Sequence, residues 1–178
     1  IAAGTTEQVL DYMIERFRAW YEEEAIPVEV FRAVAARKPS RPLDIQHRVM
    51  AVNAFSQLPE AASLAAANKR VSNILDKLES GHQFGEVNTN LLREAAESEL
   101  AEKLDQLSGI AQRHLENDEY REALASLAGL REPVDRFFDD VMVNAQEPDL
   151  RNNRLNLLKR LRDQFLEVAD ISQLVVGK

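Results

Sequence analysis

The sequence predicts an all-α domain, and three observations lead to that prediction. Alanine, leucine, glutamate, arginine and lysine dominate the 178 residues, and these residue types enter helices at little cost. Apolar residues recur at spacings of three and four along most of the chain. Apolar residues make up 45% and charged residues 29%, with only six glycines and six prolines, as in chains that fold.

We expect one domain over residues 1–178, built as a bundle of about seven to eight helices. Prolines, glycines and polar loops separate the predicted helices. Their approximate ranges are 5–24, 27–36, 43–58, 59–78, 91–115, 119–129, 133–142 and 148–168.

The first two helices have clear start signals. Thr5 and Gln8 form the pattern of a capping box, in which each side chain satisfies a backbone N–H of the other residue. Apolar residues follow at helical spacing to about Glu24. Residues 1–24 therefore form either the first helix of the domain or a connecting helix from a preceding domain of a longer chain. Pro27 suits the first position of the second helix.

A basic connector joins the second and third helices. It contains Arg37, Lys38 and Arg41, has no acidic residue, and is bounded by prolines that stop helices. Two interpretations are open. The connector is either an ordinary solvated loop or a contact for phosphate groups.

The fourth helix carries polar groups in a regular column. Apolar residues over 64–78 predict one continuous buried face. At 100° per residue, Lys69, Asn73 and Lys77 then lie together on the opposite face, with Arg70 beside them. Lysine and arginine suit phosphate oxygens and asparagine suits base edges, so this face predicts RNA contact, although an ordinary solvated face has the same pattern.

The patterns over residues 79–129 predict structural elements rather than a binding site. Glycines, asparagines and threonine over residues 79–90 predict a loop. A long pattern over residues 91–115 with a glutamate-rich polar side predicts a solvated helix. A short helix follows, and Gly129 is a suitable residue to end it.

The last two helices form a predicted helical hairpin. The apolar positions that we expect in the core of its first helix are Val134, Phe137, Phe138, Val141 and Met142. In its second helix, Arg154 falls within the apolar stripe, where an unpaired charge would cost several kcal/mol. We expect an ion pair with Asp139 or Asp140 rather than a ligand role. Arg151 and Asn153 lie off the stripe and are candidates for meeting a partner.

Catalytic and metal-binding apparatus is absent from the sequence patterns. The three histidines, His47, His82 and His114, have no second ligand at helical metal-site spacing, and there is no cysteine. No glycine-rich phosphate loop or nucleophile elbow occurs. The net charge of −8 argues against general nucleic-acid affinity, so any RNA contact must be local. Nothing predicts a membrane span or a signal peptide, and the lack of cysteine fits a reducing cytoplasm.

Four segments resemble one family in the same order. RPLDIQHRVMAVNAF, LAAANKRVSNIL, LREPVDRFFDDVMV and RNNRLNLLKRLRDQFLEVADIS are similar to the β subunits of bacterial glycyl-tRNA synthetases, the form built from separate α and β chains. The resemblance implies an all-helical, DALR-like anticodon-binding domain at the C-terminus of the β subunit, similar to that of arginyl-tRNA synthetases. The family pattern supports the segments around Lys69, Arg70 and Asn73 and around Arg151 and Arg154.

The same resemblance implies the partners. They are tRNA for glycine and the α subunit, in a cytoplasmic heterotetramer whose catalysis, with ATP and Mg, lies mainly on the α subunit, so this chain would bind no cofactor itself. A second hypothesis is a structural helical module that docks on other domains or on the α subunit without touching RNA. It predicts an exposed apolar patch. A third, an independent helical enzyme, is disfavoured by the missing active-site patterns.

Overall fold

The computed structural model describes residues 5–78 and 81–175, with side chains from residue 12 onward. Within these ranges it contains eight α-helices, three 3₁₀ helices and no strand, which confirms the all-α prediction. The α-helices are α1 (Thr5–Glu23), α2 (Val28–Ala35), α3 (Pro42–Ser56), α4 (Ala61–Leu75), α5 (Ala95–Leu115), α6 (Tyr120–Leu127), α7 (Arg131–Asp140) and α8 (Pro148–Leu166). The 3₁₀ helices are η1 (Thr89–Leu91), η2 (Ala128–Leu130) and η3 (Ile171–Leu174). The predicted capping box of Thr5 and Gln8 lies on side chains outside the described part.

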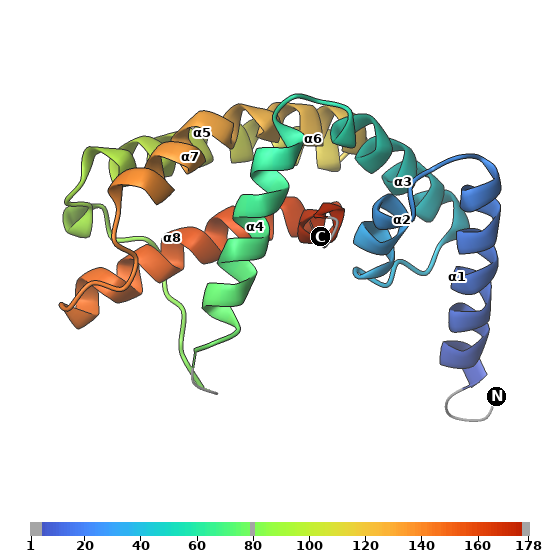
Figure 1. Cartoon of the computed structure of the whole chain (residues 1–178), viewed down its shortest axis with the longest axis horizontal. Helices are drawn as coiled ribbons and strands as arrows, with labels where there is room; N and C mark the ends of the chain where they lie inside the picture. Colours follow the sequence, from blue (N-terminus) through green and yellow to red (C-terminus); the bar gives the residue numbers. More distant parts are fainter. Residues whose placement is uncertain (1–4, 79–80, 176–178) are drawn as a thin grey trace.

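The helices are arranged around α8, which α4 crosses near the middle of the molecule (Figure 1). α5 and α7 pack against each other along one side of α8, and α6 connects them to α3. At the other end, α2 packs on α3 and η3, and α1 extends outward from its contact with α2. The C-terminal η3 lies between α2 and α4, so segments far apart in sequence meet there.

The core is built from the apolar faces that the spacing predicts. Ile45, Val49, Val52 and Phe55 of α3 are all buried. The ring of Phe55 packs on that of Phe165 in α8, with centroids 6.2 Å apart. Burial of a leucine or phenylalanine side chain stabilises a fold by about 1.5–3 kcal/mol, so these faces determine how the helices pack.

Three local predictions are wrong. α5 begins at Ala95 rather than residue 91, because Glu94 and Glu97 form a capping box there. Gly129 does not end a helix, since η2 continues directly into α7. The missing side chain of Gly129 instead leaves room for α5: a Cβ there would lie 3.2 Å from Cδ1 of Leu107. Met142 is 73% exposed because α7 ends at Asp140 and the chain continues extended.

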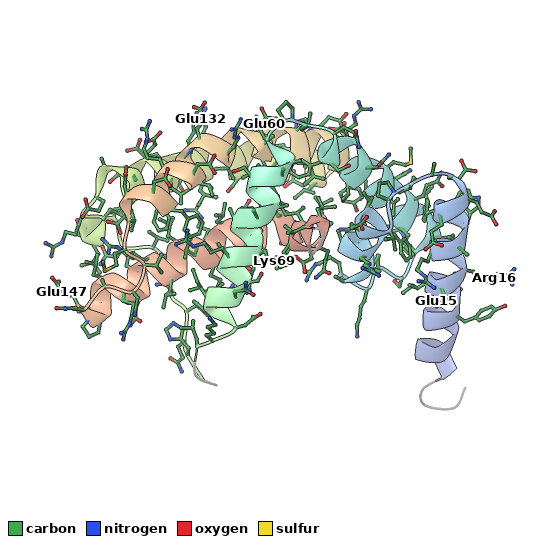
Figure 2. The ribbon with its side chains drawn as sticks, in the orientation of Figure 1. Glu15, Arg16, Glu60, Lys69, Glu132 and Glu147 are labelled. Carbon is green, nitrogen blue, oxygen red and sulfur yellow. The ribbon has the colours of Figure 1, made fainter. Side chains whose placement is uncertain are left out.

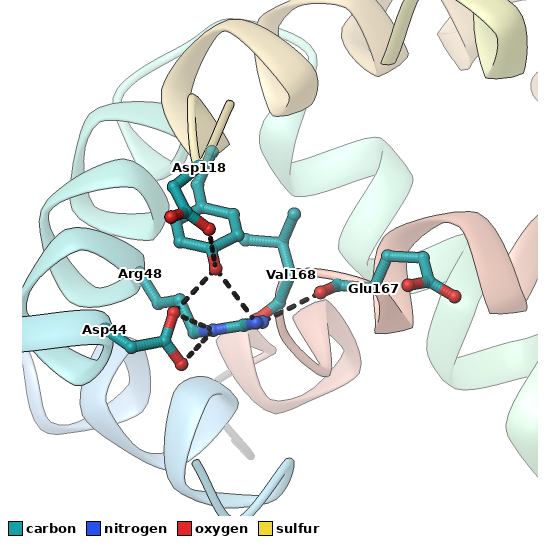
Figure 3. Close-up of polar contacts among 6 residues, drawn as sticks. Asp44, Arg48, Asp118, Glu167 and Val168 are labelled. Atoms are coloured by element: carbon teal, nitrogen blue, oxygen red, sulfur yellow. Dashed lines mark hydrogen bonds and ion pairs between the residues drawn. The ribbon is translucent and has the colours of Figure 1, made fainter. Parts of the chain in front are cut away.

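A polar network centred on Arg48 fastens α3 and α6 to the end of α8 (Figure 3). Nε of Arg48 donates to both carboxylate oxygens of Asp44, at 3.1 and 3.0 Å. Nη1 donates to the carbonyls of Glu167 and Val168, at 2.7 and 2.8 Å. The Tyr120 hydroxyl donates to Asp44 at 2.6 Å. A cation at the C-terminal carbonyls of a helix is stabilising, so the network both caps α8 and holds three helices together.

The network gives Tyr120 a testable alkaline response. Burial and the hydrogen bond to Asp44 raise the pKa of Tyr120 from 10.0 to about 12, although the charge of Arg48 opposes the shift. A raised pKa means that the fold favours the neutral phenol. Its contribution to stability is therefore complete below pH 10.0 and is lost as the pH rises through about 12.

We expect Tyr120→Phe to lower the free energy of unfolding by about 1 kcal/mol at neutral pH, because Asp44 loses a donor. The difference from the wild type should shrink steadily above the usual tyrosine pKa, as the wild-type phenol ionises. Urea unfolding of both proteins across this alkaline range measures the difference. A difference that stays constant with pH would contradict the assignment.

Candidate functional site

α4 presents Lys69, Arg70 and Asn73 of the polar column that the helical wheel predicts, whereas Lys77 lies in the turn after the helix, because α4 ends at Leu75 rather than at residue 78. Lys69, Arg70, Asn73 and Lys77 are all exposed, whereas Val71 on the opposite face is buried. Figure 2 shows Lys69 on the side of α4 that faces the C-terminal segment. The guanidinium of Arg70 lies 4.3 Å from the ring centroid of Phe138 in α7, so that side chain also supports the packing of α4.

A cleft of about 750 Å³ lies between α2, α4, α8 and η3, and we call it the central cleft. Its cationic side chains come from four different segments of the chain. The charged and amide residues that line it are Glu29, Arg32, Arg37, Lys69, Asn73, Asp76, Arg162, Asp170 and Gln173. Four cations and three carboxylates therefore share the cleft with two amides, a mixture that offers both donors and acceptors.

Arg162 is the cationic residue in the central cleft with an unsatisfied donor. Its Nε is buried and has no hydrogen-bond partner within the part of the chain that the structure describes. Its Nη1 is 4.0 Å from Oδ1 of Asp76, which is an ion pair at the limit of contact. A buried donor without a partner costs about 1–3 kcal/mol, and because this Nε is covered from solvent, the charge of the guanidinium rather than the Nε itself is what Arg162 offers to the cleft.

The cationic residues of the basic connector do not all line the central cleft. Arg37 lines the central cleft, whereas Lys38 and Arg41 are exposed and line none of its walls. The reason is a turn of the backbone at Lys38, which has a φ of 51° and ends the last turn after α2. Two cleft residues, Arg32 and Arg162, were not singled out from the sequence, because only the packing of α2 and α8 brings them to Lys69.

Arg154 is paired, but the predicted partner is wrong. Its Nε and Nη2 donate to Glu97 of α5 at 2.8 and 3.2 Å, and Nη1 donates to the carbonyl of Met142 at 2.7 Å. Glu97 is fully buried and Arg154 is 4% exposed. Asp139 and Asp140 are exposed at the end of α7, pointing away from the interior. The sequence favoured those aspartates because they lie close to Arg154 along the chain. The packing of the helices instead places the start of α5 against α8.

Glu97 is held as a carboxylate by several donors. Its Oε2 accepts from the backbone N–H groups of Arg93 and Glu94, at 2.9 and 2.8 Å. Burial disfavours the charged form, but the hydrogen bonds from Arg154 and from the backbone outweigh it and lower the pKa of Glu97. Its contribution to stability is thus present above the usual glutamate pKa and is lost as the pH falls through the lowered value. The Glu94 and Glu97 pair was the available sequence signal for this site.

Asn153 is buried rather than free to meet a partner, which corrects the prediction. Its amide accepts from the backbone N–H of Asn88 at 2.7 Å and donates to the carbonyl of Asn88 at 3.0 Å. Asn156, one turn later, accepts from the N–H of Gly85 at 3.1 Å. These two amides hold the loop before α5 against α8. Arg151 stays partly exposed on the outer side of α8.

The described residues hold no group of three or more histidine, cysteine, aspartate or glutamate side chains placed to bind a metal ion. The donors and acceptors that line the central cleft are chemically suited to a polar, phosphate-bearing molecule. None of the helices in the described ranges is both long enough and apolar enough to span a bilayer.

α1 carries an exposed apolar surface, as the docking hypothesis predicts. Tyr12 is 62% and Trp20 is 43% exposed. Met13, Phe17 and Trp20 line a shallow recess of about 290 Å³. Exposed apolar surface of this kind is typical of a contact site.

Comparisons with known proteins agree with the sequence resemblance. Residues 64–171, from α4 to η3, match the family described as DALR anticodon binding domain. The chain is 57% identical over 172 residues to the glycine–tRNA ligase beta subunit of Marinobacter nauticus, covering 96% of this chain and 25% of that protein. It is 52% identical to the same subunit of Shewanella baltica and 53% identical to that of Glaesserella parasuis, each time covering 97% of this chain and 25% of the relative. The chain thus spans about a quarter of the length of these relatives.

The buried ion pair generates a stability prediction. We expect Glu97→Gln and Arg154→Leu each to lower the free energy of unfolding by about 3–5 kcal/mol, because each leaves a buried charge without its partner. The double variant should lose less than the sum of the two single losses. Urea unfolding provides the values, and Asp139→Asn serves as the control, with an expected change within about 0.5 kcal/mol. Additive losses for Glu97 and Arg154, or a large loss for Asp139→Asn, would contradict this pairing.

Proposed function

This chain belongs to the DALR anticodon binding domain family, and from that premise we propose that it binds the anticodon stem-loop of tRNA for glycine. The observation that carries the proposal is the meeting of Arg37, Lys69 and Arg162 with amides in the central cleft. Bases of an anticodon loop are unstacked, so their edges are open to hydrogen bonds from side chains. In an acidic chain, such a local cluster of donors favours one shaped RNA over nucleic acid in general.

The chemistry of the central cleft suits a loop rather than a duplex. Lys69 and Arg37 can donate to phosphate oxygens, which position the RNA. Asn73 can both donate to and accept from a base edge, and Asp76 can accept from an exocyclic amine. The guanidinium of Arg162 adds a positive charge at the wall of the cleft. Different groups within the central cleft would therefore position the RNA backbone and recognise the base edges.

The whole protein has a larger role in this proposal. Given the similarity to glycine–tRNA ligase beta subunits, the chain would serve ATP-dependent attachment of glycine to tRNA, within a cytoplasmic heterotetramer of α and β subunits. ATP and Mg would be used by the α subunit, which carries most of the catalysis. The role of this chain would be to bind the anticodon end of the tRNA.

A second candidate function rests on α1. Its exposed Tyr12 and Trp20 suit docking on another domain or on the α subunit, with or without RNA contact elsewhere. Residues 1–24 would then be the connecting helix. This candidate by itself leaves the donors of the central cleft without a role, which is why RNA binding is the main proposal.

The central cleft gives a test with a matched control. We expect Arg37→Ala/Lys69→Ala to weaken binding of a glycine-anticodon stem-loop by roughly tenfold, and to reduce the slope of log Kd against log salt by about 1.4, since two phosphate contacts are lost. Lys38→Ala/Arg41→Ala removes the same amount of charge from the connector that carries Arg37, but outside the cleft, and should change both values much less. Fluorescence anisotropy over a range of NaCl concentrations measures them. Equal losses in the two variants would show that the cleft is not the binding site.

Recognition of the anticodon bases can be tested separately from binding of the RNA backbone. We expect the wild-type chain to bind a stem-loop with the glycine anticodon at least about thirtyfold more tightly than one with two anticodon bases changed, because each wrong base costs about 1–3 kcal/mol and the two costs roughly add. Gel-shift titration with both hairpins measures the ratio. Equal affinity would indicate that only the backbone is bound. No affinity for either hairpin would favour the docking function.

A further inference from the structure

Exposed apolar side chains gather at one end of the molecule. Five large apolar side chains are exposed in the part of the chain that the structure describes, and four of them precede α4. Tyr12 and Trp20 belong to α1, whereas Leu43 and Met50, which are 57% and 52% exposed, belong to α3. We call these four side chains the N-terminal apolar surface. Figure 1 shows α1, α2 and α3 at one end of the molecule and the turn after α7, which carries the fifth side chain, Met142, at the other.

The apolar side chains of α1 cover more of that helix than its contact with α2 uses. At 100° per residue they span an arc of about 200°. The arc contains Tyr12, Met13, Ile14, Phe17, Trp20 and Tyr21. At one edge of the arc, Tyr21 is 2% exposed and packs its ring on that of Phe31 in α2, with centroids 5.7 Å apart. The other side, with Tyr12 and Trp20, stays exposed. One contact requires an apolar stripe of about 100°, so this arc indicates a second packing partner for α1.

The position of α1 points the same way. Its 19 residues make a helix about 28 Å long. Figure 1 shows the N-terminal turns of α1 projecting beyond α2 and α3. Helices in proteins owe most of their stability to the packing of an apolar face rather than to intrinsic propensity. The contact with α2 supplies such packing only near the end of α1, where Tyr21 lies.

From these observations we infer that the N-terminal apolar surface packs against another domain of the same polypeptide, outside the residues of this chain. The match to the DALR family begins at residue 64, after α1, α2 and α3. The similarity to the glycine–tRNA ligase beta subunits covers 96–97% of this chain, so it includes most of these three helices. It covers only 25% of each relative, and the remaining length is ample for further domains.

The size of the surface favours a linked domain over a separate chain. A stable interface between separate proteins uses about 20–30 residues a side. The N-terminal apolar surface has four large side chains, with the rim of α1 and α3 around them. A domain in the same polypeptide is present at a high effective concentration, so a smaller contact is enough to hold it. This inference concerns domain docking, goes beyond the proposed RNA binding and does not depend on it.

Photo-crosslinking in the full-length protein tests the occupant. The photo-reactive residue p-benzoylphenylalanine replaces Trp20, Met50 or, as a matched control, the equally exposed Met142. We expect positions 20 and 50 to crosslink to peptides outside the 178 residues, with no change in the mass of the denatured polypeptide. Position 142 should not reach those peptides. Products of doubled mass, products joined to a different chain, or no crosslink from positions 20 and 50 would each overturn the inference.

Amide hydrogen exchange provides a second readout that does not depend on crosslinking chemistry. In the full-length protein, Tyr12→Lys/Trp20→Lys should speed the exchange of α1 amides by roughly tenfold or more, because the second contact no longer opposes local opening. The amides of α5 should keep their rates, and Met142→Lys should leave α1 unchanged. Unchanged α1 rates in the double variant would contradict the docking. Because these substitutions lie outside the central cleft, RNA binding is measured separately, and its failure would not affect this result.

Discussion

The buried ion pair between Glu97 and Arg154 is the constraint on which the arrangement of the helices depends. Two charges inside a core are tolerated only when each is satisfied, and here the carboxylate also caps α5 while the guanidinium also binds the carbonyl of Met142. The start of α5, the turn after α7 and the middle of α8 are therefore fixed to one another. A purely apolar contact would hold these elements together with less directional precision, because dispersion and the hydrophobic effect do not depend on orientation.

Fixing α8 also fixes the central cleft. Arg162 of α8 lies in the wall of the central cleft, opposite groups from α2 and α4, so the position of this helix sets the shape of the cleft. The Arg48 network holds the C-terminal end of this helix, and the amides of Asn153 and Asn156 hold the loop that follows α4. Asn153, Arg154 and Asn156 of α8 thus serve to position neighbouring segments. Binding groups on a supported helix lose little conformational entropy when a ligand arrives.

Binding groups that are placed close together explain how a chain with a negative net charge could bind RNA. The net charge of −8 repels nucleic acid at long range, and only closely placed cations with amides can compensate for it locally. In the proposed function this favours a specific loop over any duplex. The exposed apolar surface of α1 lies at the far end of the molecule, so docking through α1 and RNA binding at the central cleft would not compete (Figure 1).

The sequence by itself determined the class of fold, the buried faces and the exposed column on α4, because each depends only on the 3.6-residue period of a helix. It also showed that Arg154 needs a partner, since one helical wheel reveals a charge in an apolar stripe. Only the tertiary structure decided that the partner is Glu97, that Asn153 is buried, and that Arg162 joins Lys69. These facts depend on contacts between residues more than fifty positions apart, which no local period encodes.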